Sequence, residues 1–166
     1  PGLEPEGLRP PIPQRGRQSA HTAITLTREA SKSRLFRERE AVALSPVNAA
    51  EAELARLRRE HEEMLAEALA QPATPEMEAK AQAIDWAMHD TFIDALDNEI
   101  IAKAYLVNSV KIRLIHQERF RIDGRVVPVM REHLAVIEAM ENRNPQKAVE
   151  AISQHIDNAR RLALQI

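Results

Sequence analysis

From Thr27 onward, apolar side chains recur along the chain at helical spacing almost without interruption. Positions three and four residues apart share one face of an α-helix, and no strand-like alternation competes with this pattern. Stop and start signals divide it into six predicted helices, at about 28–44, 46–69, 75–97, 98–121, 126–141 and 145–164. The short connections between them predict an all-α fold, an antiparallel bundle of about six helices.

Three of the predicted helices begin with a capping residue that is followed by proline. The pairs are Ser45-Pro46, Thr74-Pro75 and Asn144-Pro145, and each places a side-chain oxygen before a proline at the first helical position. Asp123-Gly124 is expected to form a turn. The fourth predicted helix is apolar on more than one face, so we expect it at the centre of the bundle.

The first 25 residues differ from the rest of the chain. Prolines at 1, 5, 10, 11 and 13 and glycines at 2, 7 and 16 predict turns or extended segments in place of helix. We therefore divide the chain into a non-helical segment, residues 1–25, and a helical domain, residues 26–166.

Composition narrows the class of protein. Hydrophobic residues make up 44% of the chain, enough for a buried core, and the formal net charge of −2 argues against a general nucleic-acid or membrane binder. The chain has no cysteine, which excludes disulfides and thiolate metal sites. No apolar run reaches the roughly 18 residues that a membrane-spanning helix needs, so we expect a cytoplasmic protein without membrane contact.

Four polar residues lie within apolar helix faces. Asp85 and His89 are four residues apart on the predicted buried face of the third helix, so their side chains project from one side of adjacent turns. His133 lies at the centre of the apolar stripe of the fifth helix, and His155 at the centre of that of the sixth. A bundle core does not bury such groups unless they satisfy each other or bind a ligand.

The spacing of the two later histidines predicts that they meet. His133 precedes the turn near Arg143 by about 10 residues and His155 follows it by about 12, so both lie roughly 15–18 Å from the turn. Three imidazoles and a carboxylate suit a divalent ion such as Zn, Ni or Mn. A buried histidine can also be an ordinary hydrogen-bonded core residue. His61, on an apolar face of the second helix, indicates that this chain accommodates one outside the set.

Short motifs around these residues resemble the FCD domain, the ligand-sensing domain of FadR-like regulators in the GntR family. The segment DWAMH at 85–89, followed by Asn98, resembles its D-x-x-x-H…N signature. The segment EHLAVI at 132–137 resembles its E-H-x-x-I block, and residues 144–155 resemble the closing block that ends in a histidine. RLFRE at 34–38 resembles the R-x-x-L-E of its first helix, with arginine in place of an apolar residue. The resemblance covers about residues 26–164.

This resemblance implies a divalent metal ion whose coordination is completed by a small carboxylate effector, and it implies a homodimer. The ligands that it implies agree with the set reached from the helix faces: Asp85, His89, His133 and His155. The effector needs positive or donor-rich neighbours, and we expect these at Arg34, Asn108 and Arg113. A solvated face is an equally good interpretation of the two arginines.

Residues 3–16 resemble the end of a winged helix-turn-helix domain, and a proline-rich linker is the alternative. We therefore expect a non-enzymatic sensing domain that reaches operator DNA only through a winged helix-turn-helix domain, most of which this sequence lacks. A metal-dependent hydrolase with its active site in the bundle is the second hypothesis. It needs a general base, and Glu132 points about 100° away from His133 around the helix. A plain oligomerisation bundle would leave four core polar residues unexplained.

Overall fold

The computed structural model describes residues 15–48, 51–119, 122 and 124–164, with side chains at 24–44, 51–113, 122 and 124–164. Six helices make up most of this part: α1 (Arg15–Asn48), α2 (Glu51–Ala70), α3 (Pro75–Asp94), α4 (Glu99–Arg119), α5 (Val126–Glu141) and α6 (Pro145–Leu164). The described residues contain no strand, and the predicted all-α fold is confirmed. None of the described helices combines the length and apolarity that crossing a membrane demands.

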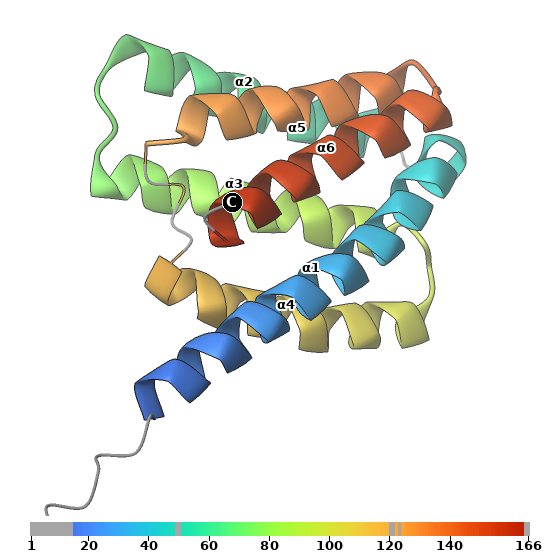
Figure 1. Ribbon diagram of the computed structural model, residues 1–166. Helices are drawn as coiled ribbons and strands as arrows, with labels where there is room; N and C mark the ends of the chain where they lie inside the picture. Colours follow the sequence, from blue (N-terminus) through green and yellow to red (C-terminus); the bar gives the residue numbers. More distant parts are fainter. Residues whose placement is uncertain (1–14, 49–50, 120–121, 123, 165–166) are drawn as a thin grey trace, which may run out of the picture.

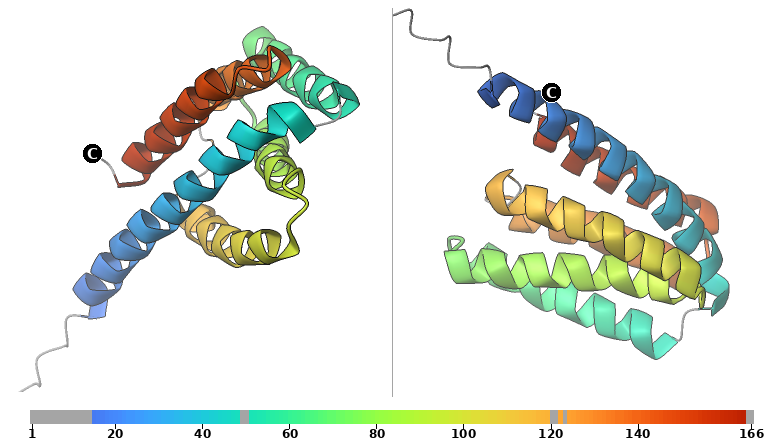
Figure 2. Two further views of the ribbon diagram at one scale, coloured as in Figure 1. Left: turned by 90° about the vertical axis from the view of Figure 1, so that its right-hand side faces the viewer. Right: turned by 90° about the horizontal axis from the view of Figure 1, so that it is seen from below.

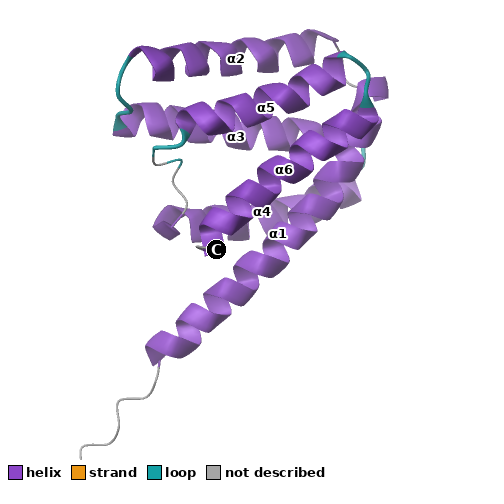
Figure 3. Ribbon diagram, turned by 45° about the horizontal axis from the view of Figure 1, so that its top comes forward, coloured by secondary structure: helices purple, strands orange, loops and turns teal. Residues whose placement is uncertain are grey.

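The helices form an antiparallel bundle in which helices adjacent in sequence run in opposite directions (Figure 1). α5 packs against both α2 and α6, and α1 packs mainly against α6 and α4 (Figure 2). α3 contacts α1, α2, α4 and α5, which places it inside the bundle. α1 is the longest helix, with 34 residues, and its N-terminal turns extend beyond the ends of the other helices (Figure 3).

Local signals set the start of α3 and the hairpin between α5 and α6, as predicted. The hydroxyl of Thr74 accepts a hydrogen bond from the first turn of α3, and Pro75 occupies the first helical position. In the hairpin, Arg143 adopts a left-handed conformation with a φ of 50°. The Asn144 N–H then donates to the Ala139 carbonyl at 2.9 Å, a bond typical of a helix C-cap.

Both ends of α1 differ from the prediction. The helix begins at Arg15, so the expectation of non-helical structure over residues 15–25 was wrong. Gly16 is the one glycine or proline in that stretch, and a single glycine costs a helix only about 1 kcal/mol. At its other end α1 continues through Ser45 and Pro46, so the predicted cap at Ser45 and helix start at Pro46 were wrong. The rest of the expected wing and linker, residues 1–14, lies outside the described residues.

α4 lies at the edge of the bundle, and the prediction that it is central was wrong. It contacts α1 and α3. Four of its large apolar side chains are exposed: Ile100 (82%), Leu106 (55%), Val107 (60%) and Val110 (45%). A helix that is apolar on more than one face is therefore not buried on every such face within one chain.

Two apolar clusters fill the interior. The larger one includes Met88, Phe92, Ile137, Met140 and Ile152, and the smaller one includes Met64, Met77, Val126, Val129 and Met130. Asp85 of α3 and His133 of α5 each lie, along their helices, between members of the two clusters. The polar residues singled out from the sequence therefore occupy the boundary between two well-packed apolar regions.

Candidate metal centre

Three helices bring the four predicted residues together. Asp85 and His89 come from adjacent turns of α3, His133 from the middle of α5 and His155 from α6. All four are buried, with relative exposures of 7%, 2%, 0% and 2%. One ligand atom from each lies within 4.8 Å of the other three. We call these four residues the His–Asp cluster.

The cluster presents three imidazole Nε2 atoms and one carboxylate oxygen to a common point. The Nε2 of His155 lies 3.2 Å from that of His89 and 3.3 Å from that of His133. Oδ1 of Asp85 lies 3.3 Å from Nε2 of His133, 3.7 Å from that of His89 and 3.9 Å from that of His155. The arrangement is that of a small, closed N₃O donor set.

Carboxylates outside the cluster fix the orientation of two of its rings. Nδ1 of His89 lies 2.6 Å from Oε2 of Glu38, and Nδ1 of His155 lies 2.9 Å from Oε2 of Glu132. An ionised carboxylate can only accept, so in both rings Nδ1 carries a proton and donates it. The lone pair of each neutral ring is then on Nε2, which faces the cluster. Such carboxylate partners are typical of metal-binding histidines.

The donor set requires a cation between the rings. The two Nε2 atoms of His89 and His155 lie 3.2 Å apart, and with both Nδ1 atoms protonated this contact needs either a second proton on His89 or a metal ion between the two nitrogens. Facing lone pairs repel each other unless a proton or a metal ion bridges them. Nitrogen and carboxylate oxygen in this proportion are the donors that Zn²⁺ and similar divalent ions prefer. The residues present therefore fit a divalent metal.

The electrostatics of the site match these ligand roles. Burial alone would raise the pKa of Asp85, but hydrogen bonds from His133 and His89 hold it well below its usual range. Burial, then the charge of a neighbouring histidine, lowers the pKa of His133 and of His155 to about 3. Burial and the Arg34 guanidinium oppose protonation of His89, but Glu38 and Asp85 raise its pKa above the usual value. At neutral pH the carboxylate is thus ionised and two rings are neutral, as metal binding requires.

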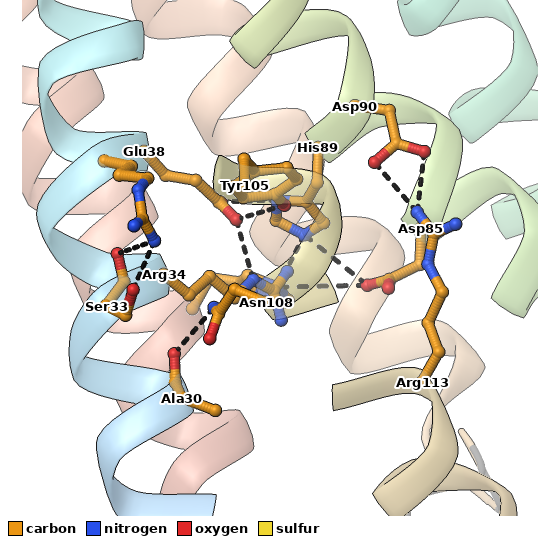
Figure 4. A network of polar contacts seen from close by, with 12 residues as sticks. Ala30, Ser33, Arg34, Glu38, Asp85, His89, Asp90, Tyr105, Asn108 and Arg113 are labelled. Carbon is orange, nitrogen blue, oxygen red and sulfur yellow. Dashed lines mark hydrogen bonds and ion pairs between the residues drawn. The ribbon is translucent and has the colours of Figure 1, made fainter. Parts of the chain in front are cut away.

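Glu38 is a buried residue to which sequence reasoning assigned no role. It is fully buried and accepts hydrogen bonds from Arg34 Nε at 2.7 Å, Tyr105 Oη at 2.8 Å and His89 (Figure 4). Burial would raise the pKa of Glu38, but the charges of Arg34 and His89 lower it to about 2. The signal was present in the sequence, since Arg34 and Glu38 are four residues apart and share the face of α1 that buries Ala30 and Ala41.

Glu132 also has a role that sequence reasoning missed. As predicted, it does not lie within the cluster. It contacts the outer side of one ring, accepting from His155 Nδ1, and it also accepts from Asn158 Nδ2 at 2.8 Å. Glu132, the neighbour of His133 in sequence, is therefore the hydrogen-bond partner of the histidine on the next helix.

A pocket adjoins the cluster at His89. It is lined in addition by Arg34, Trp86, Tyr105, Ser109, Ile112 and Arg113, and we call it the arginine pocket. The guanidinium of Arg113 lies 5.0 Å from the centre of the Trp86 ring and donates to both carboxylate oxygens of Asp90, at 2.6 and 2.8 Å. Asn108 does not line the pocket; its amide donates to the Ala30 carbonyl at 3.0 Å and ties α4 to α1 (Figure 4).

Comparisons with known proteins agree with this fold. A family model described as the FCD domain matches residues 29–158. The solved metal-free FCD domain of TM0439, a "putative transcriptional regulator", has a TM-score of 0.69 at 22% identity, covering 86% of this chain and 94% of that chain. The Zn²⁺-bound FCD domain of TM0439 has a TM-score of 0.68, with the same 22% identity and coverages of 86% and 94%. No curated protein gives a significant match.

Proposed function

This chain belongs to the FCD domain family, and we propose that it is the metal-dependent sensing and dimerisation domain of a bacterial GntR-family transcription regulator. One observation carries this proposal. Four buried residues on three helices place ligand atoms within 4.8 Å of one another, in a donor set that suits a divalent ion.

The ligands that we propose for the metal are Asp85, His89, His133 and His155. Zn²⁺ is bound by the FCD domain of TM0439, and Zn, Ni and Mn all accept this set of donors. When bound, the metal supplies a Lewis-acidic centre to which a carboxylate oxygen of an effector can coordinate. The surrounding apolar clusters exclude water, and the outer hydrogen bonds hold the rings in place.

A small organic acid is the effector that we propose for the arginine pocket, which has to widen to admit it because the free volume is about 10 Å³. A divalent ion in the cluster adds two positive charges beside the pocket, so an anion is then more strongly attracted to the neighbouring space. Arg34 and Arg113 both line that space and offer the guanidinium donors that carboxylates prefer.

α1 is the element through which the site can act on the rest of a regulator. It carries both Arg34 of the pocket and Glu38, the partner of His89, and its N-terminal turns extend past the bundle (Figure 3). We propose that a winged helix-turn-helix domain attached at this end reads operator DNA. For the effector to regulate that domain, it must bind the two states of the bundle with different affinity.

A metal-dependent hydrolase is less well supported. Such an enzyme needs a general base within reach of a metal-bound water. Of the described carboxylates nearest the cluster, Glu38 accepts three hydrogen bonds and Glu132 is held by His155 and Asn158. Both act as partners of histidine Nδ1 atoms, on the side of the rings away from the cluster.

Thermal unfolding with and without effector candidates tests the proposal. A panel of small mono- and dicarboxylates should raise the Tm of the Zn²⁺-loaded protein and leave the metal-free protein unchanged. Asp85→Asn should abolish this response. Glu63→Gln is the matched control, because Glu63 is exposed on α2 and remote in sequence from the cluster residues. Equal stabilisation of the metal-free and Zn²⁺-loaded proteins would contradict an effector site beside the metal.

A further inference from the structure

His61 of α2 is a fully buried histidine that contacts the His–Asp cluster from outside. Its Nδ1 lies 2.7 Å from the carbonyl oxygen of Leu57, one turn earlier in the same helix. Its Nε2 lies 3.0 Å from Nδ1 of His133. The two rings meet edge to face, with centroids 5.1 Å apart and an interplanar angle of 68°. His61 therefore links a backbone carbonyl to the outer nitrogen of His133.

Counting protons along this chain of contacts leaves one arrangement. Both rings are fully buried, and a neutral imidazole carries one proton, on either of its two nitrogens. The Leu57 carbonyl can only accept, so the proton of His61 is on Nδ1. Its Nε2 is then an acceptor, and the proton in the 3.0 Å contact belongs to Nδ1 of His133.

The reverse arrangement is unfavourable. A proton on Nε2 of His61 would leave its Nδ1 bare, with a lone pair 2.7 Å from the lone pairs of the Leu57 carbonyl oxygen. A buried carbonyl facing a bare nitrogen loses its hydrogen bond, which costs about 1–3 kcal/mol. The backbone of α2 therefore selects the tautomer of His61, and His61 in turn selects that of His133.

We propose that His61 is a positioning residue for the metal: it holds His133 in the Nδ1-protonated tautomer and so presents the Nε2 lone pair to the cluster. This inference rests on the proposed metal site. His61 plays for His133 the part that Glu38 plays for His89 and Glu132 for His155, but it adds no charge. A neutral partner suits this position because Asp85 and Glu38 already place two buried negative charges beside the cluster.

Three substitutions separate this role from packing. His61→Gln keeps an acceptor, Oε1, at the distance of Nε2 from the backbone, and it should retain Zn²⁺ affinity. His61→Asn reaches only as far as Nδ1, and His61→Leu has no acceptor. Both should weaken Zn²⁺ binding by about 10- to 100-fold, the effect typical of outer partners of metal ligands. The measurement is competition with a chromogenic chelator on the full chain. Equal Zn²⁺ affinity for Gln, Asn and Leu would overturn the proposal.

Nitrogen-15 NMR of the histidine side chains gives a readout that packing alone does not change. In long-range ¹H–¹⁵N spectra of the metal-free wild type, His61 and His133 should both appear as Nδ1-protonated tautomers. On addition of Zn²⁺, of the four ring nitrogens of His61 and His133 only Nε2 of His133 should move strongly. A metal-free His133 protonated at Nε2, or Zn²⁺ bound through its Nδ1, would overturn the proposal.

The proposed metal site and the proposed role of His61 can be refuted separately. If the wild type binds none of Zn²⁺, Ni²⁺ and Mn²⁺, the proposed function fails, while the spectra of the metal-free protein still test the tautomers of His61 and His133. If the wild type binds Zn²⁺ and His133→Ala abolishes binding, but His61→Leu binds as tightly as His61→Gln, the metal site stands and the role of His61 is refuted. The spectra of the wild type decide the question even if His61→Leu fails to fold.

Discussion

Glu38 of α1 accepts a hydrogen bond from Nδ1 of His89 of α3 at 2.6 Å, and this contact joins the longest helix of the bundle to the His–Asp cluster. The same carboxylate accepts from Arg34 and from Tyr105 of α4. One buried group thus links three helices to one ligand of the proposed metal. A change in the position of His89 would therefore act on α1, the helix that extends out of the bundle, through its hydrogen bond to Glu38.

Replacement of Glu38 should weaken both the fold and the metal site. In Glu38→Gln the buried guanidinium of Arg34 loses its countercharge, which should lower the free energy of unfolding by about 3 kcal/mol. His89 loses a carboxylate partner, so Zn²⁺ affinity should fall by about 10- to 100-fold. Urea unfolding of the metal-free protein and chelator competition measure the two effects. Glu63→Gln, on an exposed position, should leave both unchanged; wild-type Zn²⁺ affinity in Glu38→Gln would contradict the role given to Glu38.

Replacement of Arg113 should separate effector binding from metal binding. Arg113→Met removes one of the two guanidinium groups of the arginine pocket but none of the four proposed ligands. It should bind Zn²⁺ as the wild type does and lose most of the carboxylate-dependent rise in Tm. Asp90→Asn is the matched control, since it removes the ion-pair partner of Arg113 and keeps the guanidinium. A wild-type carboxylate response in Arg113→Met would place the effector elsewhere.

The metal-free protein should lose stability on mild acidification. The pKa values of His61, His133 and His155 are lowered to about 4, 3 and 3, so between these values and 6.5 the unfolded chain binds more protons than the folded one. Their contribution is present above pH 6.5 and is lost as the pH falls. The pKa of His89 is raised, so this one histidine contributes to stability in the opposite direction, and the other three outweigh it. Below pH 4.5 the lowered pKa of Glu38 adds a further loss.

Urea unfolding of chelator-treated protein between pH 7 and pH 5 measures this dependence. The free energy of unfolding should decrease steadily over that range. A constant or increasing value would show that the three histidines are not held neutral in the folded protein, and the electrostatic account of the cluster would be wrong.

The chain should form a homodimer that binds DNA weakly and without sequence preference. Light scattering measures the dimer, and titration with random and promoter duplexes at several salt concentrations measures the binding. Its formal net charge of −2 gives little general attraction to phosphate, so any binding should be weak. Because such binding would rest on Lys and Arg contacts to phosphate, it should be lost as salt is added. Tight, salt-resistant preference for a promoter duplex would show that the bundle itself reads DNA. A monomer at micromolar concentration would contradict the proposed dimerisation.

The sequence predicted most of the fold and the four members of the cluster because both depend on local patterns. Thr74-Pro75 caps a helix through its own side chain, and Asp85 and His89 share a face because of helix geometry alone. His133 and His155 lie at similar distances in sequence from a single turn, which places them at one level of the hairpin. Each of these inferences uses one helix or one pair of adjacent helices.

What the sequence did not predict depends on helices distant in the chain. The contact of Glu38 with His89 spans 51 residues, and that of His61 with His133 spans 72. The position of α4 at the edge of the bundle likewise depends on how the other helices pack against one another. The apolar faces of α4 do not predict this position. The prolines do not predict where α1 begins, because all of those in this segment precede Arg15 and none interrupts the helix that follows.

The central claim is that one divalent ion is bound by the His–Asp cluster. Elemental analysis of protein purified without a nickel column, combined with X-ray absorption at the edge of the metal found, tests it most directly. We predict one divalent ion per chain, with three imidazole nitrogens and a carboxylate oxygen at about 2.0–2.2 Å if the ion is Zn²⁺, and loss of the metal in His155→Ala. A wild type that stays metal-free after incubation with Zn²⁺, Ni²⁺ and Mn²⁺, or a His155→Ala variant that keeps the metal with unchanged coordination, would contradict it.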